Sequence, residues 1–522
     1  MAVAVAVAGF SKGRKVDMQY KRSFLSSLLL AACHAATSPR DAPKADIAAN
    51  VTVLFSAAVA GALEPCGCSP DQRGGVYRAA ALIDRVRAEV PGALYLEGGD
   101  LLFESAKIPD VKRDQAKWKA ETLAATAKLE RLTALSIGER DRAEGDDFLS
   151  KQLLPIAATT NLYDAGGVRV GVATGAEAST LAAQNKALRD GHARLTLLVA
   201  HASVSRAQAL ASAAAAAGFD AILAGHADDP QEQQNVAIAQ TAIPVFAVEG
   251  RGQSLLRLDF VLPPSGSPGA ILLGGEAARA EMLKALDVRI AAEREKLPSA
   301  KEPLRSLVAA KIADLEKRRA MAASAKEEVP VDRVTVRATF TRLEKGLPES
   351  AAAHALIDAY NNKVTMYNIE AAKALPAKCQ VEEKSATTYV GAQSCRECHA
   401  DAYAFWKTTP HANAYAKLEK VNKQFSLDCV GCHVVGWQRA SGPCRIDKPK
   451  ALGLADVQCE SCHGAGSLHV VDPPDHLEDV DVPQSRCMQC HEAENSPHFN
   501  FATYRPRIIG PGHGQPMVAP KP

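Results

Sequence analysis

Four short strings near the C-terminus constrain this chain more than any other feature. Each has two cysteines three residues apart, followed directly by a histidine: Cys395, Cys398 and His399; Cys429, Cys432 and His433; Cys459, Cys462 and His463; Cys487, Cys490 and His491. Two thiols at this spacing can both reach the vinyl groups on one edge of a porphyrin, and the adjacent histidine then lies under the iron as its proximal ligand. Zinc sites also use paired cysteines, but they do not require a histidine after every pair. The four strings therefore predict four covalently attached c-type haems.

The segment around these strings, residues 389–515, is predicted to be a mainly α-helical or irregular tetrahaem cytochrome c domain. So short a segment cannot bury enough side-chain surface around four large cofactors, so the macrocycles are expected to serve as its core. Haems held this close together form a chain of redox centres, whose potentials depend on ligands, burial and hydrogen bonds. This segment is therefore expected to transfer electrons between redox-partner proteins.

A second axial ligand decides what each iron can do. Outside the strings, the segment contains five more histidines: His411, His469, His476, His498 and His513. A second histidine gives a six-coordinate haem suited to electron transfer, whereas an open position allows a small molecule to bind. Spacing alone does not select among these five residues.

Residues 389–514 resemble the tetrahaem cytochrome family that accepts electrons from hydroxylamine oxidoreductase. The resemblance includes Tyr403, Trp406 and the Pro-His-Ala sequence at residues 410–412, the stretch 457–469 around the third string, and the closing Gly-His-Gly at 512–514. In that family three haems have two histidine ligands and the fourth is five-coordinate.

Carried over by position, the resemblance implies His411, His469 and His513 as distal ligands and leaves the open haem to His433. The expected pairs are His469 with His399, His411 with His463, and His513 with His491. His498 is the alternative to His513 as this distal ligand, whereas His476 is expected at the surface.

The N-terminus reads as a targeting segment. Lys21 and Arg22 precede an apolar run that is too short to span a bilayer and that ends in Leu-Ala-Ala-Cys33. This ending resembles a bacterial lipoprotein cleavage box, which implies a lipid on Cys33. Residues 1–33 are then the signal, which is complete from Met18 onward, and residues 34–50 are a tether. The chain is expected to be exported and lipid-anchored in the periplasm or at the outer membrane or cell surface; an ordinary signal peptide is the alternative.

Short apolar runs alternate with helical patterns over residues 51–265, which predicts an α/β domain. The expected strands are 51–55, 93–96, 168–172, 195–199, 221–223 and 243–246, and helices are expected at 75–89 and 203–217. Two antiparallel helices, a strand at 333–340 and a helix at 349–375 are expected within a spacer and linker at 266–388. The net charge of +2 provides no basic surplus for nucleic acid.

The order of elements in residues 51–265 resembles the calcineurin-like metallophosphatase and 5′-nucleotidase superfamily, which implies a four-layer α/β sandwich with two metals. Of the family's metal ligands, the sequence retains Asp100, His201 and His226. Asp228 stands where the family has the last histidine of its final metal motif and could still serve as a ligand. Ala58 and Ala60 stand where the first metal motif would lie, and the Asn-His of the second motif is replaced by Glu139-Arg140. The remaining ligands are too few for a dinuclear site, so the domain is expected to be an inactive scaffold.

Two further cysteine pairs complete the inventory. Cys66 and Cys68 are expected to form a structural disulfide, and the alternatives are that they bind copper or another soft metal or that each pairs elsewhere. A bridge between Cys379 and Cys444 would tie the linker to the haem segment.

The sequence is compatible with three functions. The first is that of an electron carrier, and the second is that of an oxidoreductase acting on a small nitrogen or sulfur species at an open haem. A metallophosphatase or 5′-nucleotidase with accessory haems is the third.

Overall fold

The computed structural model describes residues 48–65, 72–226, 237–264, 267–273, 275–299, 301–302, 304–324, 330–381, 387–473, 477, 479, 481–492, 496 and 499–513. The predicted signal with its lipid-bearing Cys33 and the tether up to residue 47 lie outside these residues, as do Cys66, Cys68, Asp228, His476 and His498, whereas residues 49 and 50 of the predicted tether already belong to the first strand. Within the described ranges, no helix has the length and apolar character needed to cross a bilayer.

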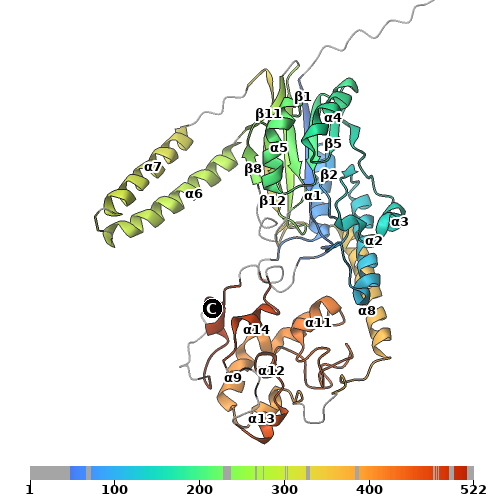
Figure 1. The fold of residues 1–522 in the computed structure, drawn as a ribbon, viewed down its shortest axis with the longest axis vertical. Coiled ribbons are helices and arrows are strands. Elements are labelled where there is room, and N and C mark those ends of the chain that lie inside the picture. Colours follow the sequence, from blue (N-terminus) through green and yellow to red (C-terminus); the bar gives the residue numbers. More distant parts are fainter. Residues whose placement is uncertain are drawn as a thin grey trace, which may run out of the picture. The chain divides into compact units, whose positions relative to one another are not determined.

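Two six-stranded β-sheets organise the N-terminal part (Figure 1). The first sheet, in spatial order, contains β11 (Ser267–Leu273), β12 (Arg333–Arg342), β10 (Ser254–Leu262), β1 (Ala49–Ser56), β2 (Leu94–Glu97) and β3 (Ala134–Leu135). The second contains β4 (Thr160–Ala165), β5 (Val168–Thr174), β6 (Leu195–Ala200), β7 (Ala221–Ala224), β9 (Pro244–Ala247) and β8 (Ala237–Gln240). All six predicted strands are present. The α/β prediction is therefore confirmed for this part of the chain.

The two sheets pack face to face through buried apolar side chains such as Phe55, Val172 and Phe246. Helices cover the outer faces. The first sheet packs against α1 (Val76–Glu89), α2 (Arg113–Leu129) and α8 (Ala351–Ala372), and the second against α4 (Ala178–Asp190) and α5 (Val204–Ala216). Runs of β-branched and leucine residues are fully buried in this arrangement because both faces of each sheet are covered.

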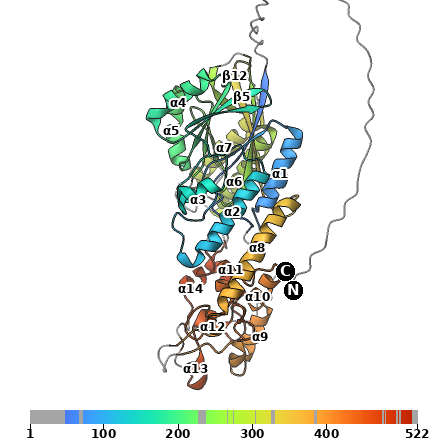
Figure 2. The same cartoon turned by 90° about the vertical axis from the view of Figure 1, so that its right-hand side faces the viewer.

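The structure differs from the sequence-based division in residues 266–388. The helices α6 (Gly275–Lys296) and α7 (Leu304–Ser324) are antiparallel as predicted, and ion pairs such as Lys311–Glu293 (2.8 Å) join them. However, β12 lies between β10 and β11, with Val336 opposite Phe260, and α8 lies alongside α2 (Figure 2). Sequence alone assigned both elements to a spacer, because their periodicity shows that a face is buried but not what buries it.

The C-terminal segment is built from short helices joined by loops. These are α9 (Ala400–Thr408), α10 (Ala414–Lys420), α11 (Leu427–His433), α12 (Cys459–His463), α13 (Ser467–Val471), α14 (Gln484–Met488) and α15 (Phe501–Tyr504). One small apolar cluster contains Tyr415, Val430, Val434 and Ile446. Elements this short are too small to stabilise themselves, which agrees with the expectation that cofactors fill the interior.

Several contacts join this segment to the first part of the chain. The predicted Cys379–Cys444 disulfide is present, with Cα atoms 4.9 Å apart. Lys112 and Lys119 of the α2 region form ion pairs of 2.6 and 3.2 Å with Asp428, the residue before the second string. The second string is therefore anchored directly on the α2 surface.

Asp428→Asn is expected to lower the free energy of unfolding at pH 7 by about 1 kcal/mol, a value reduced for solvent screening because the carboxylate is half exposed. Burial opposes ionisation, but Lys119 and Lys112 lower the pKa of Asp428 to about 2. Since this pKa is depressed in the folded state, the stabilisation is complete above the ordinary value of 3.8 and is lost as pH falls toward 2. Urea unfolding at pH 7 and pH 2.5 should show a difference that shrinks at low pH. Asp358→Asn, an exposed position on α8, is the matched control and should have no effect at either pH.

Candidate functional site

Each cysteine–histidine string lies on or beside a single helical turn. The second and third strings lie within α11 and α12, and the His399 and His491 amides donate to the carbonyls of Cys395 and Cys487, both at 2.9 Å. Residues three and four positions apart share one face of a helix. The two sulfurs and the imidazole of each string are therefore directed to the same side, as attachment to one macrocycle requires.

Hydrogen bonds orient three of the four proximal histidines. Through Nδ1, His433 donates to the carbonyl of Ala414 (2.6 Å) and His463 to that of Asp479 (2.7 Å). His491 Nδ1 is hydrogen-bonded to Ser496 Oγ at 3.0 Å. Binding the Nδ1 position leaves Nε2 available as a metal ligand. Burial also lowers the pKa of His433 and of His491, which favours the neutral imidazole that binds iron.

Two of the predicted distal histidines face a proximal histidine. The ring centroids of His399 and His469 are 6.2 Å apart with an interplanar angle of 22°, and those of His411 and His491 are 6.2 Å apart at 46°. Since a metal–imidazole bond is about 2 Å long, two imidazoles that share one iron have centroids about 6 Å apart. Both pairs therefore have the separation of axial ligands.

The structure differs from the sequence-based pairing at two positions. His411 faces His491 and not His463, while His513 lies near enough to both His463 and His399 for their charges to interact. The pair His399–His469 agrees with the prediction. The resemblance identifies candidate ligands by position along the chain, but which rings face each other depends on how the loops between the strings fold.

Cysteines of different strings also lie side by side. The Cys395 thiol lies near enough to Cys459 to interact with it, the Cys490 thiol lies near enough to Cys432, and Cys462 lies near Cys487. The attachment edges of the first and third, third and fourth, and fourth and second strings are thus adjacent. In space the strings follow the order first, third, fourth, second.

Sequence reasoning missed the carboxylate that connects the start of the segment to the third string. Glu460 is buried, and it accepts the backbone N–H groups of Gly391 (2.7 Å) and Gly466 (2.9 Å) as well as that of Val390. A buried carboxylate needs such donors to offset its desolvation. Glu460 lies inside the third string, where its sequence position alone gives no sign of its three backbone donors.

A second cluster of ligand-type side chains lies in the N-terminal part. Asp100 follows β2, Glu139 follows β3, His201 follows β6 and His226 follows β7, and their ligand atoms all lie within 4.8 Å of one another. Burial opposes ionisation of Asp100, but the hydrogen bond from His226 and the charges at His201 and Arg140 hold its pKa below the usual value. Asp100, His201 and His226 were predicted to remain from a metal site. Glu139 was treated as a replaced ligand, and the structure brings it into the cluster.

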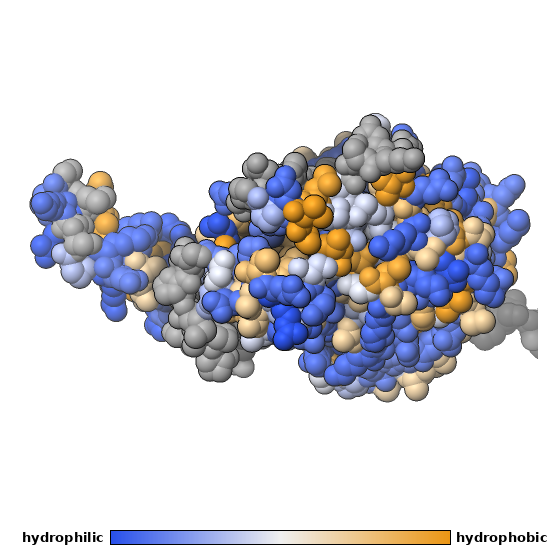
Figure 3. Space-filling model, turned by 90° about the horizontal axis from the view of Figure 1, so that it is seen from below, coloured by the Kyte–Doolittle hydropathy of each residue, from blue (hydrophilic) through white to orange (hydrophobic). Residues whose placement is uncertain are grey.

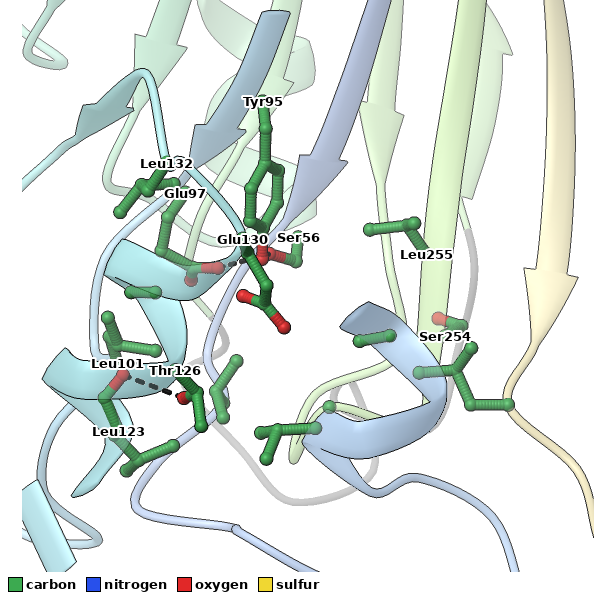
Figure 4. A pocket seen from close by; sticks show the side chains of 16 residues that line it. Ser56, Tyr95, Glu97, Leu101, Leu123, Thr126, Glu130, Leu132, Ser254 and Leu255 are labelled. Atoms are coloured by element: carbon green, nitrogen blue, oxygen red, sulfur yellow. Dashed lines mark hydrogen bonds between the residues drawn. The ribbon is translucent and has the colours of Figure 1, made fainter. Parts of the chain in front are cut away.

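A small cavity lies at the C-terminal ends of β1 and β2. Figure 4 shows two carboxyl groups at its wall, Glu97 from β2 and Glu130, the residue after α2. Its volume of about 30 Å³ has room for a water molecule. Glu97 accepts a hydrogen bond from Ser56, whose hydroxyl is also 2.7 Å from that of Tyr95. Burial raises the pKa of Glu97 well above its ordinary value, which favours its neutral form, and raises that of Glu130 to about 8, so the Glu130 carboxyl is protonated at pH 7.

A protein-family model described as cytochrome c554 and c-prime matches residues 394–464, which contain the first three strings. The C-terminal region therefore carries a cytochrome c family domain, and this family binds haem c covalently. No curated protein matches the sequence significantly.

The solved structures that are similar to the chain include two hydrolases of Thermus thermophilus and one phosphoesterase of Bacillus subtilis. The sulfate thiohydrolase SoxB of Thermus thermophilus is 16% identical over 42% of this chain and 54% of its own, with a TM-score of 0.33. The calcineurin-like phosphoesterase YfkN of Bacillus subtilis is 16% identical over 41% of this chain and 85% of its own (TM-score 0.33). A 5′-nucleotidase precursor, also of Thermus thermophilus, is 12% identical over 79% of this chain and 74% of its own (TM-score 0.39). The chain thus spans about half the length of the thiohydrolase.

Proposed function

We propose that this protein is an exported electron carrier with four covalently bound haems c in its C-terminal domain, anchored through a lipid on Cys33. The observation that carries the proposal is the separation of 6.2 Å in both imidazole pairs, each of which joins a string histidine to a histidine outside the strings. Two imidazoles on one iron give the six-coordinate haem suited to electron transfer. The N-terminal part serves as a four-layer metallophosphatase-like scaffold and docking module.

The order of the strings supports an electron path. Sulfur neighbours connect the first, third, fourth and second strings in turn, so the haems attached there would follow one another in that order. The His399 haem would stand at one end and the His433 haem at the other, next to the α2 surface that holds Asp428. A redox partner would exchange electrons at the first of these ends.

Exposed apolar side chains on the C-terminal domain agree with cofactor binding. Leu468, Val470, Val471 and Met488 are exposed beside the first, third and fourth haem positions, and Figure 3 shows apolar side chains interspersed with charged ones when the molecule is seen from below. Macrocycles and a partner protein would cover such side chains.

A second candidate function is reduction or oxidation of a small nitrogen or sulfur species. With His469, His411 and His513 assigned to the other three irons, the resemblance leaves the five-coordinate haem at His433. An open iron in the ferrous state binds carbon monoxide or nitric oxide, and six-coordinate irons do not.

The periplasmically matured protein is expected to show the mass of four added haems and to bind about one carbon monoxide per chain when reduced. His411→Ala should free the iron of the fourth string and raise this to about two, measured by titration of the reduced Soret band. His354→Ala, on α8, is the control and should leave the titration unchanged.

The pairing can be tested separately. In a protein lacking the fourth haem through Cys487→Ala and Cys490→Ala, His411→Ala should add no further carbon monoxide site. If it still adds one, His411 serves another haem and the pairing is wrong. A matured protein without haem absorbance would overturn the proposed function altogether.

A further inference from the structure

The Asp100–Glu139–His201–His226 cluster is assembled from both sheets. Its residues follow four different strands, and Asp100 and His226 are separated by 126 positions in the chain. Asp100 is fully buried, the two imidazoles are mostly buried, and the Glu139 side chain is about half exposed. The cluster is therefore a lined site with one side open to solvent.

Its geometry suits a single ion. His226 Nδ1 lies 2.9 Å from Asp100 Oδ2 and His201 Nε2 lies 2.7 Å from Glu139 Oε2, and the crossed distances, His201 to Asp100 and His226 to Glu139, are both 3.7 Å. Ligand atoms about 2.1 Å from one metal ion lie about 3 to 4 Å from each other. An ion between the four groups would thus require only small shifts of the side chains.

The surrounding backbone holds the four groups close together. Asp141 is buried and accepts the N–H groups of Asp100 (2.9 Å), Leu101 (2.8 Å) and Gly138 (2.9 Å), which joins the two loops that carry Asp100 and Glu139. A Cβ at Gly138 would collide with Asp100 and His201, so no larger residue fits there. Asp100 itself has a φ of 57°, a conformation that costs free energy and that clusters at functional sites.

The same loops do not fit the two ions that the fold resemblance implies. Ala58 and Ala60, at the end of β1, offer no side-chain ligand. The Arg140 guanidinium stands at the position of the missing histidine, and its Nε is 3.6 Å from Asp100 Oδ2. A guanidinium remains charged at every physiological pH and would repel a second cation placed next to Asp100.

We propose that this cluster binds one divalent transition-metal ion, such as Zn²⁺ or Fe²⁺, through Asp100, Glu139, His201 and His226, with Arg140 in place of a second ion. Two imidazole nitrogens and two carboxylate oxygens form a mixed ligand set that favours borderline first-row ions over Mg²⁺ or Ca²⁺, which take oxygen ligands. Glu139 supplies a second negative charge that an asparagine would not. Asp141 acts as a positioning residue for this site.

The test uses the full, haem-loaded chain equilibrated with Zn²⁺ and then freed of weakly bound metal. About one zinc per chain is expected, quantified against protein concentration so that haem iron does not enter the measurement. Zn²⁺ should also raise the thermal unfolding midpoint of the N-terminal part, since an ion that binds only the folded state stabilises it. His226→Ala should abolish both effects, and Glu139→Gln should weaken zinc binding at least about tenfold.

His192→Asn is the control, because asparagine tolerates the φ of 63° at this exposed loop position. It should bind zinc like the unaltered chain. Absence of bound zinc in the unaltered protein, or equal binding by His226→Ala, would overturn the assignment. Two zinc ions per chain would contradict the role given to Arg140. None of these results depends on the haems, so the proposed electron transfer is tested independently.

Discussion

Replacing both Cys379 and Cys444 with alanine is expected to lower the free energy of unfolding by about 4 kcal/mol. The disulfide joins residues 65 positions apart, and closing a loop of this length removes chain entropy of about that size from the unfolded state. The bridge lies between backbone hydrogen bonds, Cys379 to Gly442 (2.9 Å) and Cys444 to Ala377 (3.1 Å), so the native geometry does not depend on it. Urea unfolding monitored by the Soret band should show the loss.

The same effect should follow reduction of the unaltered protein, because the thiols of the four strings would already be thioethers. The double alanine variant serves as the control, since any shift that a reductant causes in its unfolding midpoint comes from another bridge, such as one at Cys66 and Cys68, and is subtracted. Equal midpoints for the oxidised, reduced and alanine forms would show that the bridge contributes nothing to stability.

Glu130→Gln is expected to stabilise the protein by a few kcal/mol above pH 8 and to have little effect near pH 4.5. Glu130 is buried at the C-terminal end of α2, and its Oε1 has no hydrogen-bond partner among the described residues. Burial raises its pKa from 4.5 to about 8, although Arg87 opposes the shift. The folded chain therefore keeps a proton that the unfolded chain has released between these two values.

That proton decides in which direction the free energy of unfolding changes with pH. Stability is greatest below pH 4.5, falls as pH rises toward 8, and then levels off, because above this pH Glu130 is ionised in both the folded and the unfolded chain. Glutamine carries no proton to release, so the variant should lose this part of the pH dependence and keep the part that belongs to Glu97. Glu121→Gln, exposed on the same helix, is the control. An unchanged slope between pH 5 and pH 8 in urea unfolding would contradict the prediction.

The buried strands were predictable because their signal is local. Residues such as those of β6 form a continuous apolar run, which only a strand covered on both faces accommodates. The same local signal described β12 and α8 correctly as a strand and a helix but did not say what they pack against. Their partners lie far away along the chain, as the pairing of Val336 with Phe260 and the packing of Ile357 near α1 show. Long-range packing of this kind leaves no mark in a short window of sequence.

The Asp100–Glu139–His201–His226 cluster shows that a sequence motif can also hide a residue of a site. Asp100, His201 and His226 were identified by resemblance, whereas Glu139 was read as a lost ligand because a family motif has a different residue there. Its carboxylate nevertheless reaches His201 at 2.7 Å, since the loop after β3 carries it to the same point. Asp141, which joins the two loops, has a role that only its four backbone donors reveal.

The sequence by itself determined the four places at which haem attachment is predicted, because attachment needs only two thiols and an imidazole within five consecutive residues. It also narrowed the distal ligands to a few histidines. Tertiary structure alone decided that His411 faces His491 and that the strings lie in the order first, third, fourth, second. The physical reason is that axial ligation requires two rings about 6 Å apart, and the loops between the strings are long enough to bring many different histidines to that separation.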